Sequence, residues 1–192
     1  MSTLEQALKR SNKLFVDGIF IENLRSLVKI VTDSKNSHRV EDLVDYYTKG
    51  LSNILAELGI QTDIVDNPIK SGPPFLIGSR MESPEFKTIL IYGHGDTVPL
   101  QVGEWHEGIS PSELKIIDDK IYGRGVADNK GQHLINLLAL HSVLKTRKKL
   151  GFNLKIIFEM GEEIGSPGLF ELCQDYKDYF KSDVLIASDG PR

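Results

Sequence analysis

Hydrophobic residues recur at helical spacing in the first third of the chain. Between residues 40 and 58 the apolar positions that share one helical face are Leu43, Tyr47, Leu51, Ile54, Leu55 and Leu58. Gly59 follows directly, and glycine commonly ends a helix. The pattern predicts a helix over residues 40–58 with its apolar face in the core, and we expect residues 1–60 to be mostly helical.

After residue 60 the pattern changes to short apolar segments separated by turn residues. It predicts strands at residues 61–65, 75–79, 88–92, 154–158 and 183–187, and a hairpin formed by residues 114–117 and 120–122. The segment 88–92 is short, apolar and bounded by turn residues, so we expect a fully buried strand there.

Two further helices are predicted among these strands, at about residues 130–145 and 168–180. His141 falls on the apolar face of the first and is expected to pack there. Strands that alternate with helices predict an α/β fold with parallel connections. In such a sheet, ligands gather beyond the carboxyl ends of the strands.

Composition narrows the class of partner. The 192 residues suffice for one domain with a core, and the net charge of −4 is spread without a basic stripe for nucleic acid or a polybasic membrane anchor. The single cysteine, Cys173, excludes an internal disulfide. Because the sequence also shows no secretory signal and no apolar run of membrane-spanning length, we expect a soluble, cytoplasmic protein that acts on a small molecule.

The strand predicted at 88–92 leads into a glycine-flanked segment that carries His94 and Asp96. In extended backbone, residues two apart point to the same side, so Asp96 can reach the ring nitrogen of His94 that a metal ion leaves free. Taken alone, this short and common pattern favours a hydrogen-bonded histidine in a loop over a metal site.

Four more carboxylates follow the ends of predicted elements: Asp128, Glu162, Glu163 and Asp189. Each has an ordinary interpretation. Asp128 could cap the next helix, the two glutamates could be solvated, and Asp189 could begin a turn into Gly190 and Pro191. Together with His94 they form a mixed histidine and carboxylate set, and His94, Glu162, Glu163 and Asp189 follow strand ends, which favours a metal site.

Four motifs occur in a characteristic order: residues 94–99 (HGDTVP), 123–131 (GRGVADNKG), 161–166 (GEEIGS) and 188–190 (SDG). In this order they resemble the M20 family of metallopeptidases, which includes carboxypeptidases, dipeptidases, aminoacylases and deacetylases. The resemblance extends from about residue 87 to the C-terminus. It implies a three-layer α/β/α sheet of the zinc-peptidase type and metal-dependent hydrolysis of amide bonds in dipeptides or N-acyl amino acids.

The resemblance also implies a role for each candidate residue. Asp128 would bridge two ions, and His94 and Asp189 would complete the ligands of one of them. Glu163 would bind the other ion, Glu162 would be the general base, and Asp96 would hold the ring of His94. Zn²⁺ suits such a set, with Co²⁺ or Mn²⁺ as substitutes. In the family the peptide bond after the bridging aspartate is cis, so we expect a cis bond between Asp128 and Asn129.

Members of the family are about twice as long, with a smaller lid and dimerisation domain and a further metal-binding histidine. The resemblance therefore implies that residues 1–192 are the N-terminal portion of a catalytic domain, either a fragment or the product of a truncated gene. We expect the chain alone to be inactive and the parent protein to be a homodimer. The alternative is a non-catalytic binding module that retains the scaffold; the presence of Glu162 favours the hydrolase.

For several other residues the sequence allows more than one role or indicates no special role. Arg124 could position a substrate carboxylate or form a structural ion pair within its loop. His106 follows Trp105 and could line the pocket, although a surface position is favoured. His38 and His133 have no motif context and are predicted to be ordinary histidines. The glycines at 123 and 125 lack the strand-to-helix spacing of a dinucleotide-binding motif, and Lys130-Gly131 reverses the glycine-lysine order of a phosphate-binding loop.

Overall fold

The computed structural model describes residues 2–36 and 40–190; His38 therefore lies outside the described residues. The N-terminal part is helical, as expected, with α1 (Thr3–Val16), α2 (Ile19–Lys29), α3 (Val40–Asp45), η2 (Tyr46–Leu51) and α4 (Ser52–Glu57). Ser2 caps α1 by accepting the backbone N–H of Glu5, whose side chain accepts the backbone N–H of Ser2 in return. The last of these helices ends before Gly59, which has a φ of 65°.

The segment predicted as a regular helix over 40–58 contains a π-helical stretch, η2. Tyr46 and Tyr47 are adjacent in it, and both are buried. A regular helix turns neighbouring residues about 100° apart, whereas the wider π turn brings more residues to the inner face. The prediction therefore gave the correct extent of the helical segment, but it was wrong in treating the whole segment as a regular α-helix.

The main sheet has five strands in the order β1 (Gln61–Val65), β2 (Phe75–Arg80), β6 (Asn153–Glu159), β3 (Thr88–His94) and β7 (Val184–Ala187). Strands β6, β3 and β7 are parallel neighbours, whereas β2 is antiparallel to both β1 and β6. The sheet is thus mixed, and its parallel half contains the three strands that end at the candidate residues.

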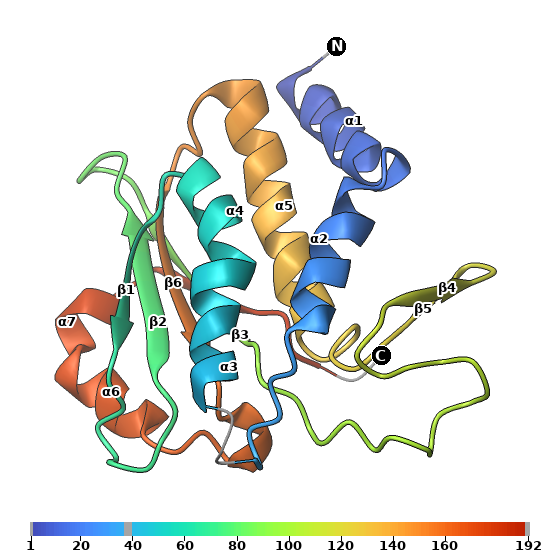
Figure 1. The fold of residues 1–192 in the computed structure, drawn as a ribbon. Helices are drawn as coiled ribbons and strands as arrows, with labels where there is room; N and C mark the ends of the chain where they lie inside the picture. The colour runs from blue at the N-terminus through green and yellow to red at the C-terminus, as the bar shows by residue number, and fades with distance from the viewer. Residues whose placement is uncertain (1, 37–39, 191–192) are drawn as a thin grey trace.

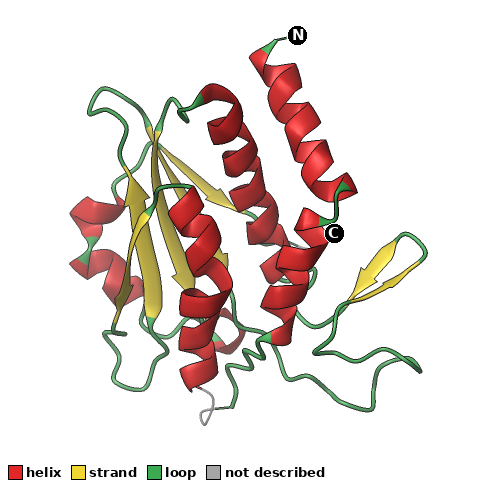
Figure 2. Cartoon of the chain, turned by 45° about the horizontal axis from the view of Figure 1, so that its top comes forward, coloured by secondary structure: helices red, strands yellow, loops and turns green. Residues whose placement is uncertain are grey.

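Helices cover both faces of the sheet (Figures 1 and 2). One face packs against the N-terminal helices and α5 (Lys130–Arg147), around Ile91, Ile156 and Phe158. The other face packs against α6 (Leu169–Asp175) and α7 (Lys177–Phe180), where Leu172 and Phe180 contact the opposite side chains of the same strands. This alternation confirms the three-layer α/β/α arrangement.

Two details differ from expectation. Strand β3 is only partly buried, because its neighbour β7 is a short edge strand whose residues are all exposed. The helix predicted over 168–180 is interrupted at Tyr176, which has a φ of −103° and a ψ of 25°.

The predicted hairpin is present as β4 (Lys115–Ile117) and β5 (Lys120–Tyr122) and projects from the body of the protein (Figure 1). Asp118 has a φ of 54° in its turn. Within the described part of the chain, no helix combines the length and apolar character needed to cross a membrane.

Candidate metal centre

His94 is the last residue of β3, and the segment that follows is held against residues 32–34. Thr32 donates its hydroxyl to the carbonyl of Gly95 at 2.6 Å, and its own carbonyl accepts the backbone N–H of Thr97 at 2.9 Å. His94 and Asp96 are fully buried between these contacts. Thr32 therefore holds the turn at Gly95 and Thr97, the residues next to His94 and Asp96.

Asp96 holds the ring of His94. The Nδ1 atom of His94 lies 3.2 Å from Oδ1 of Asp96 and 3.1 Å from its carbonyl oxygen. With Nδ1 as the donor in these contacts, Nε2 is left as the free ring atom and faces away from Asp96. This is the arrangement that the spacing of the two residues predicts.

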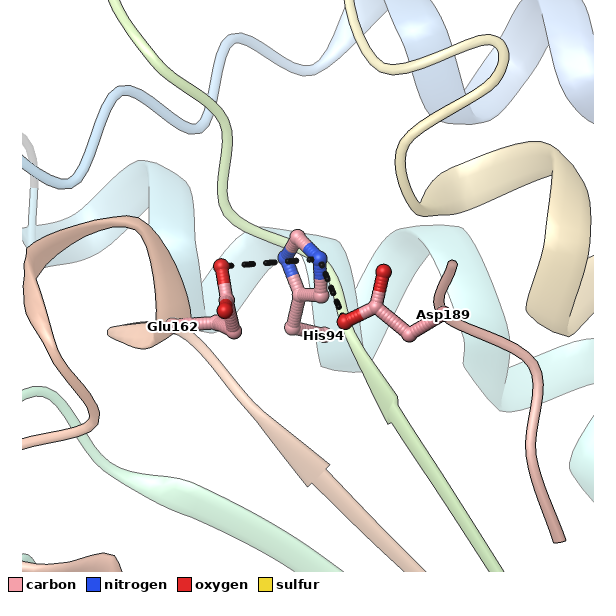
Figure 3. Close-up of side chains that lie close together, drawn as sticks. All are labelled: His94, Glu162 and Asp189. Atoms are coloured by element: carbon pink, nitrogen blue, oxygen red, sulfur yellow. Dashed lines mark ion pairs between the residues drawn. The ribbon is translucent and has the colours of Figure 1, made fainter. Parts of the chain in front are cut away.

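Three carboxylates approach Nε2 of His94. Oδ1 of Asp128 lies 3.0 Å from it, Oδ2 of Asp189 lies 3.6 Å from it and Oε2 of Glu162 lies 3.9 Å from it. Figure 3 shows Glu162 and Asp189 reaching the ring from opposite sides. The ligand atoms of His94, Glu162 and Asp189 all lie within 4.8 Å of one another. Residues from the ends of β3, β6 and β7 and from the loop before α5 thus meet at one point.

Glu162 and Glu163 lie on a single 3₁₀ turn, η3 (Glu162–Ile164), after β6. Asp96 accepts the backbone N–H of Glu162 on Oδ1 at 3.2 Å and that of Glu163 on Oδ2 at 3.1 Å. Gly165 ends the turn with a φ of 90°. The turn is therefore oriented by the same carboxylate that holds His94.

Glu163 lies apart from the group around Nε2. It lines a cavity of about 250 Å³ together with Asp128, Arg124 and the glycines at 123 and 125. Burial raises its pKa, and the negative charge of Asp128 raises it further. Glu163 therefore shares this cavity with Asp128, whereas Glu162 is the glutamate with a carboxylate oxygen 3.9 Å from Nε2 of His94.

Asp128 does not cap the following helix. The residue at the start of α5 is Asn129, and the side chain of Asp128 instead contacts His94. The Asp128–Asn129 peptide bond is cis, as expected from the family resemblance. Asp128 both lines the cavity and contacts Nε2 of His94, and its side chain remains 64% exposed. The alternative turn at Asp189 involves Pro191, which lies outside the described residues.

The clustered negative charge shifts the protonation of the site. Burial by itself lowers the pKa of His94, but the hydrogen bond and charge of Asp96, with the charges of Asp189 and Asp128, raise it to about 9. Burial and neighbouring carboxylates raise the pKa of Glu162, although the charge of His94 opposes the shift. The carboxylates repel one another, and their combined negative charge favours a positive charge among them.

The donor set fits a divalent metal ion. One imidazole nitrogen and several carboxylate oxygens converge, the other imidazole nitrogen is held by Asp96, and the backbone N–H groups of the glutamate turn are satisfied by that same aspartate. Such a mixture of nitrogen and oxygen donors suits Zn²⁺, and it also accepts Co²⁺ or Mn²⁺.

The sequence did not indicate the role of three buried residues behind the site, Tyr46, Asn129 and His133. His133, predicted to be ordinary, is fully buried and contacts both Asn129 and the hydroxyl of Tyr46. Local sequence offered no signal for this, because Tyr46 and His133 lie 87 residues apart. His141 does pack as expected, with Nε2 3.1 Å from Oε2 of Glu57.

Arg124 and His106 have different positions. Arg124 lies over the ring of Trp105 at 5.3 Å and donates to Oε1 of Gln101 at 2.8 Å. Among the described residues no carboxylate lies within ion-pair distance of Arg124, so the structural ion pair considered from the sequence is not found there. His106 is exposed.

Comparison with known proteins identifies relatives over most of the chain. The sequence profile of "Peptidase family M20/M25/M40" matches residues 90–191. The Beta-Ala-His dipeptidase of Mus musculus is 32% identical over 184 residues, which cover 89% of this chain and 37% of that protein. The Cys-Gly metallodipeptidase DUG1 of Candida albicans is 32% identical over 189 residues, which cover 89% of this chain and 38% of that protein.

Solved structures of dipeptidases have a similar fold over nearly the whole chain. The dipeptidase Dug1p from Saccharomyces cerevisiae superposes with a TM-score of 0.86 at 28% identity, over 99% of this chain and 42% of that one. Human carnosine dipeptidase 1 gives a TM-score of 0.85 at 28% identity, over 100% of this chain and 42% of that one. The chain thus spans less than half the length of these relatives. With the family profile matched across more than half of its residues, the chain belongs to peptidase family M20/M25/M40.

Proposed function

We propose that the protein is part of a metal-dependent dipeptidase. The observation that carries this proposal is the convergence of Asp128, Glu162 and Asp189 on Nε2 of His94 in a chain of the M20 family. The relatives named above are a Beta-Ala-His dipeptidase and a Cys-Gly metallodipeptidase, which supports dipeptides as the substrate class. N-acyl amino acids, which contain the same amide bond, are the second class to test.

The site residues divide the work of amide hydrolysis. His94, Asp128 and Asp189 would hold one ion, and Asp128 and Glu163 would contribute to a second. A bound ion of this kind supplies Lewis acidity and lowers the pKa of water, with zinc as the first candidate and cobalt or manganese as substitutes. Asp96 orients His94 through Nδ1.

Glu162 is assigned the general base. Its side chain is 39% exposed, so water and substrate can reach it, and Oε2 lies 3.9 Å from Nε2 of His94. Its raised pKa brings the carboxylate closer to the range in which it can both take and return a proton. A non-catalytic scaffold would not need a carboxylate of this kind beside the ligands, so the position of Glu162 favours an enzyme.

Among the described residues, the two proposed ions would have unequal sets of ligands. One ion would have His94, Asp128 and Asp189, whereas the other would have Asp128 and Glu163. We therefore propose that residues 1–192 are the N-terminal portion of the catalytic domain, that they bind at most one zinc ion tightly, and that alone they have negligible peptidase activity. For the longer parent protein we propose that it is active, that it is a homodimer and that it is located in the cytoplasm.

The test combines metal analysis with activity. The 192-residue chain, and the longer product if the reading frame continues past Arg192, are stripped with chelator, titrated with Zn²⁺ and assayed on Cys-Gly, β-Ala-His and an N-acyl amino acid. We expect one tight zinc and no turnover for the short chain, and chelator-sensitive dipeptide hydrolysis for the longer product. A longer product that binds zinc but cleaves none of these amides would contradict the proposal.

A further inference from the structure

Asn129 lies behind the metal centre and contacts the backbone beside two of its residues. Its Oδ1 atom accepts the backbone N–H of His94 at 3.4 Å, and its Nδ2 atom donates to the carbonyl of Ser188, next to Asp189, at 2.7 Å. Asn129 also follows Asp128 directly in the chain. One fully buried side chain thus joins the three segments that carry His94, Asp128 and Asp189.

The amide of Asn129 can serve all of these contacts in only one orientation. Oδ1 also accepts a hydrogen bond from Nδ1 of His133 at 3.1 Å, and Nδ2 also donates to Oε1 of Gln132 at 2.8 Å. If the amide turned over, its NH₂ group would face the N–H donors of His94 and His133. Buried polar groups without partners are costly, so the surrounding donors and acceptors select one orientation.

His133 is itself oriented by Tyr46. The hydroxyl of Tyr46 lies 2.6 Å from Nε2 of His133, and both residues are fully buried. With the hydroxyl donating to Nε2, a neutral His133 carries its proton on Nδ1 and donates it to Asn129. The hydrogen bonds then run in one direction, from Tyr46 through His133 and Asn129 to the carbonyl of Ser188.

We propose that Asn129 is a positioning residue that sets the spacing of His94, Asp128 and Asp189, and that His133 and Tyr46 fix the orientation of its amide. The inference rests on the proposed metal-binding role of those three residues and adds the group that holds them in place. Residues that orient ligands through hydrogen bonds typically change metal affinity about 10- to 100-fold when they are removed.

The chain offers a matched control for this proposal. Tyr47 is also buried, and its hydroxyl donates to the carbonyl of Phe158 at 2.8 Å rather than to His133. Tyr46→Phe and Tyr47→Phe therefore each remove one buried hydroxyl and keep the ring. Only the first breaks the hydrogen-bond chain that leads to Asn129.

The experiment measures the affinity of the chain for Zn²⁺ by competition with a chromophoric chelator, beside urea unfolding of the metal-free protein. We expect Asn129→Leu to weaken zinc binding at least about tenfold. Tyr46→Phe should weaken it by a smaller factor, and Tyr47→Phe should leave it unchanged even where unfolding shows an equal loss of stability. His133→Asn, which keeps a donor near the position of Nδ1, should retain more affinity than His133→Phe.

Equal zinc affinity for Tyr46→Phe, Tyr47→Phe and the two His133 variants would overturn the inference, even if Asn129→Leu failed to fold. That result, with tight zinc binding by the unsubstituted chain, leaves the proposed function intact. If the unsubstituted chain bound no zinc, the proposed function and this inference would both be wrong.

Discussion

Asp96 and Glu162 lie 66 residues apart in the chain, yet Oδ1 of Asp96 accepts the backbone N–H of Glu162 at 3.2 Å. The same oxygen also faces Nδ1 of His94 at 3.2 Å. One buried carboxylate therefore sets the position of His94, the proposed metal ligand, relative to the proposed general base. Asp96 therefore connects the end of β3, at His94, with the turn after β6, at Glu162.

Asp96→Asn should weaken zinc binding about 10- to 100-fold. Both oxygens of Asp96 accept hydrogen bonds, and the NH₂ group of an asparagine would place a donor against one of these N–H groups. Chelator competition measures the effect. Asp63→Asn, at an exposed position of β1, is the matched control and should bind zinc as the unsubstituted chain does. Equal affinities for both variants would refute the role of Asp96.

Glu162→Gln and Asp128→Asn should separate catalysis from metal binding. In a catalytically active product, Glu162→Gln should keep its zinc and lose at least about 10²-fold in kcat, because only the proton acceptor is removed. Asp128→Asn should lose zinc and activity together. Zinc content by elemental analysis, measured beside dipeptide turnover, distinguishes the two. Full activity of Glu162→Gln would show that another group takes the proton.

Gly95→Ala should destabilise the fold. A Cβ atom added there would lie 2.5 Å from Cε1 of Tyr46 and 2.6 Å from Cε of Met160, both of which are buried. Overpacking of this kind costs about 1 to 3 kcal/mol. Gly190→Ala, where no atom lies within 4 Å of the added carbon, is the control. Urea unfolding should show a lower midpoint for the first variant only.

Glu82 should make stability depend on pH. Burial alone would raise its pKa, but hydrogen bonds from the N–H groups of Leu150 and Gly151 and the nearby Arg80 lower it below 4.5. A carboxyl group with a lowered pKa in the folded state stabilises the protein above its unfolded pKa, and this stability is lost as the pH falls through the folded value.

The free energy of unfolding of the unsubstituted chain should therefore exceed that of Glu82→Gln most at about pH 7, and the difference should shrink towards about pH 3. Urea titrations at several pH values measure it. A difference that stays constant over this range would mean that Glu82 acts without its charge.

The strands could be predicted from sequence because their limits are set locally. Residues 61–65 and the hairpin across Asp118 and Asp119 were predicted with bounds close to those observed, since turn residues flank each apolar segment. The burial of β3 could not be predicted in the same way. It depends on β7, which is distant in sequence and is exposed at the edge of the sheet.

His94, Glu162, Glu163 and Asp189 were predictable because each lies at or just after the end of a parallel strand, and parallel strands bring their carboxyl ends to one edge. Asp128 lies in the loop before α5, and it was recognised from its motif. The roles of Asn129 and His133 were not. Their partners, Ser188 and Tyr46, lie 59 and 87 residues away, and no short motif records a contact of that range. The predicted helix includes His133, but hydrophobic periodicity does not show that its ring contacts Asn129 and Tyr46.

The central claim is that Nε2 of His94, Asp128 and Asp189 bind a metal ion. A crystal structure of the zinc-loaded protein, with anomalous diffraction at the zinc edge, tests it most directly. We predict a peak about 2.0 to 2.2 Å from Nε2 of His94 and from a carboxylate oxygen of each aspartate. Zinc peaks found only at sites that do not contact His94 would contradict the account.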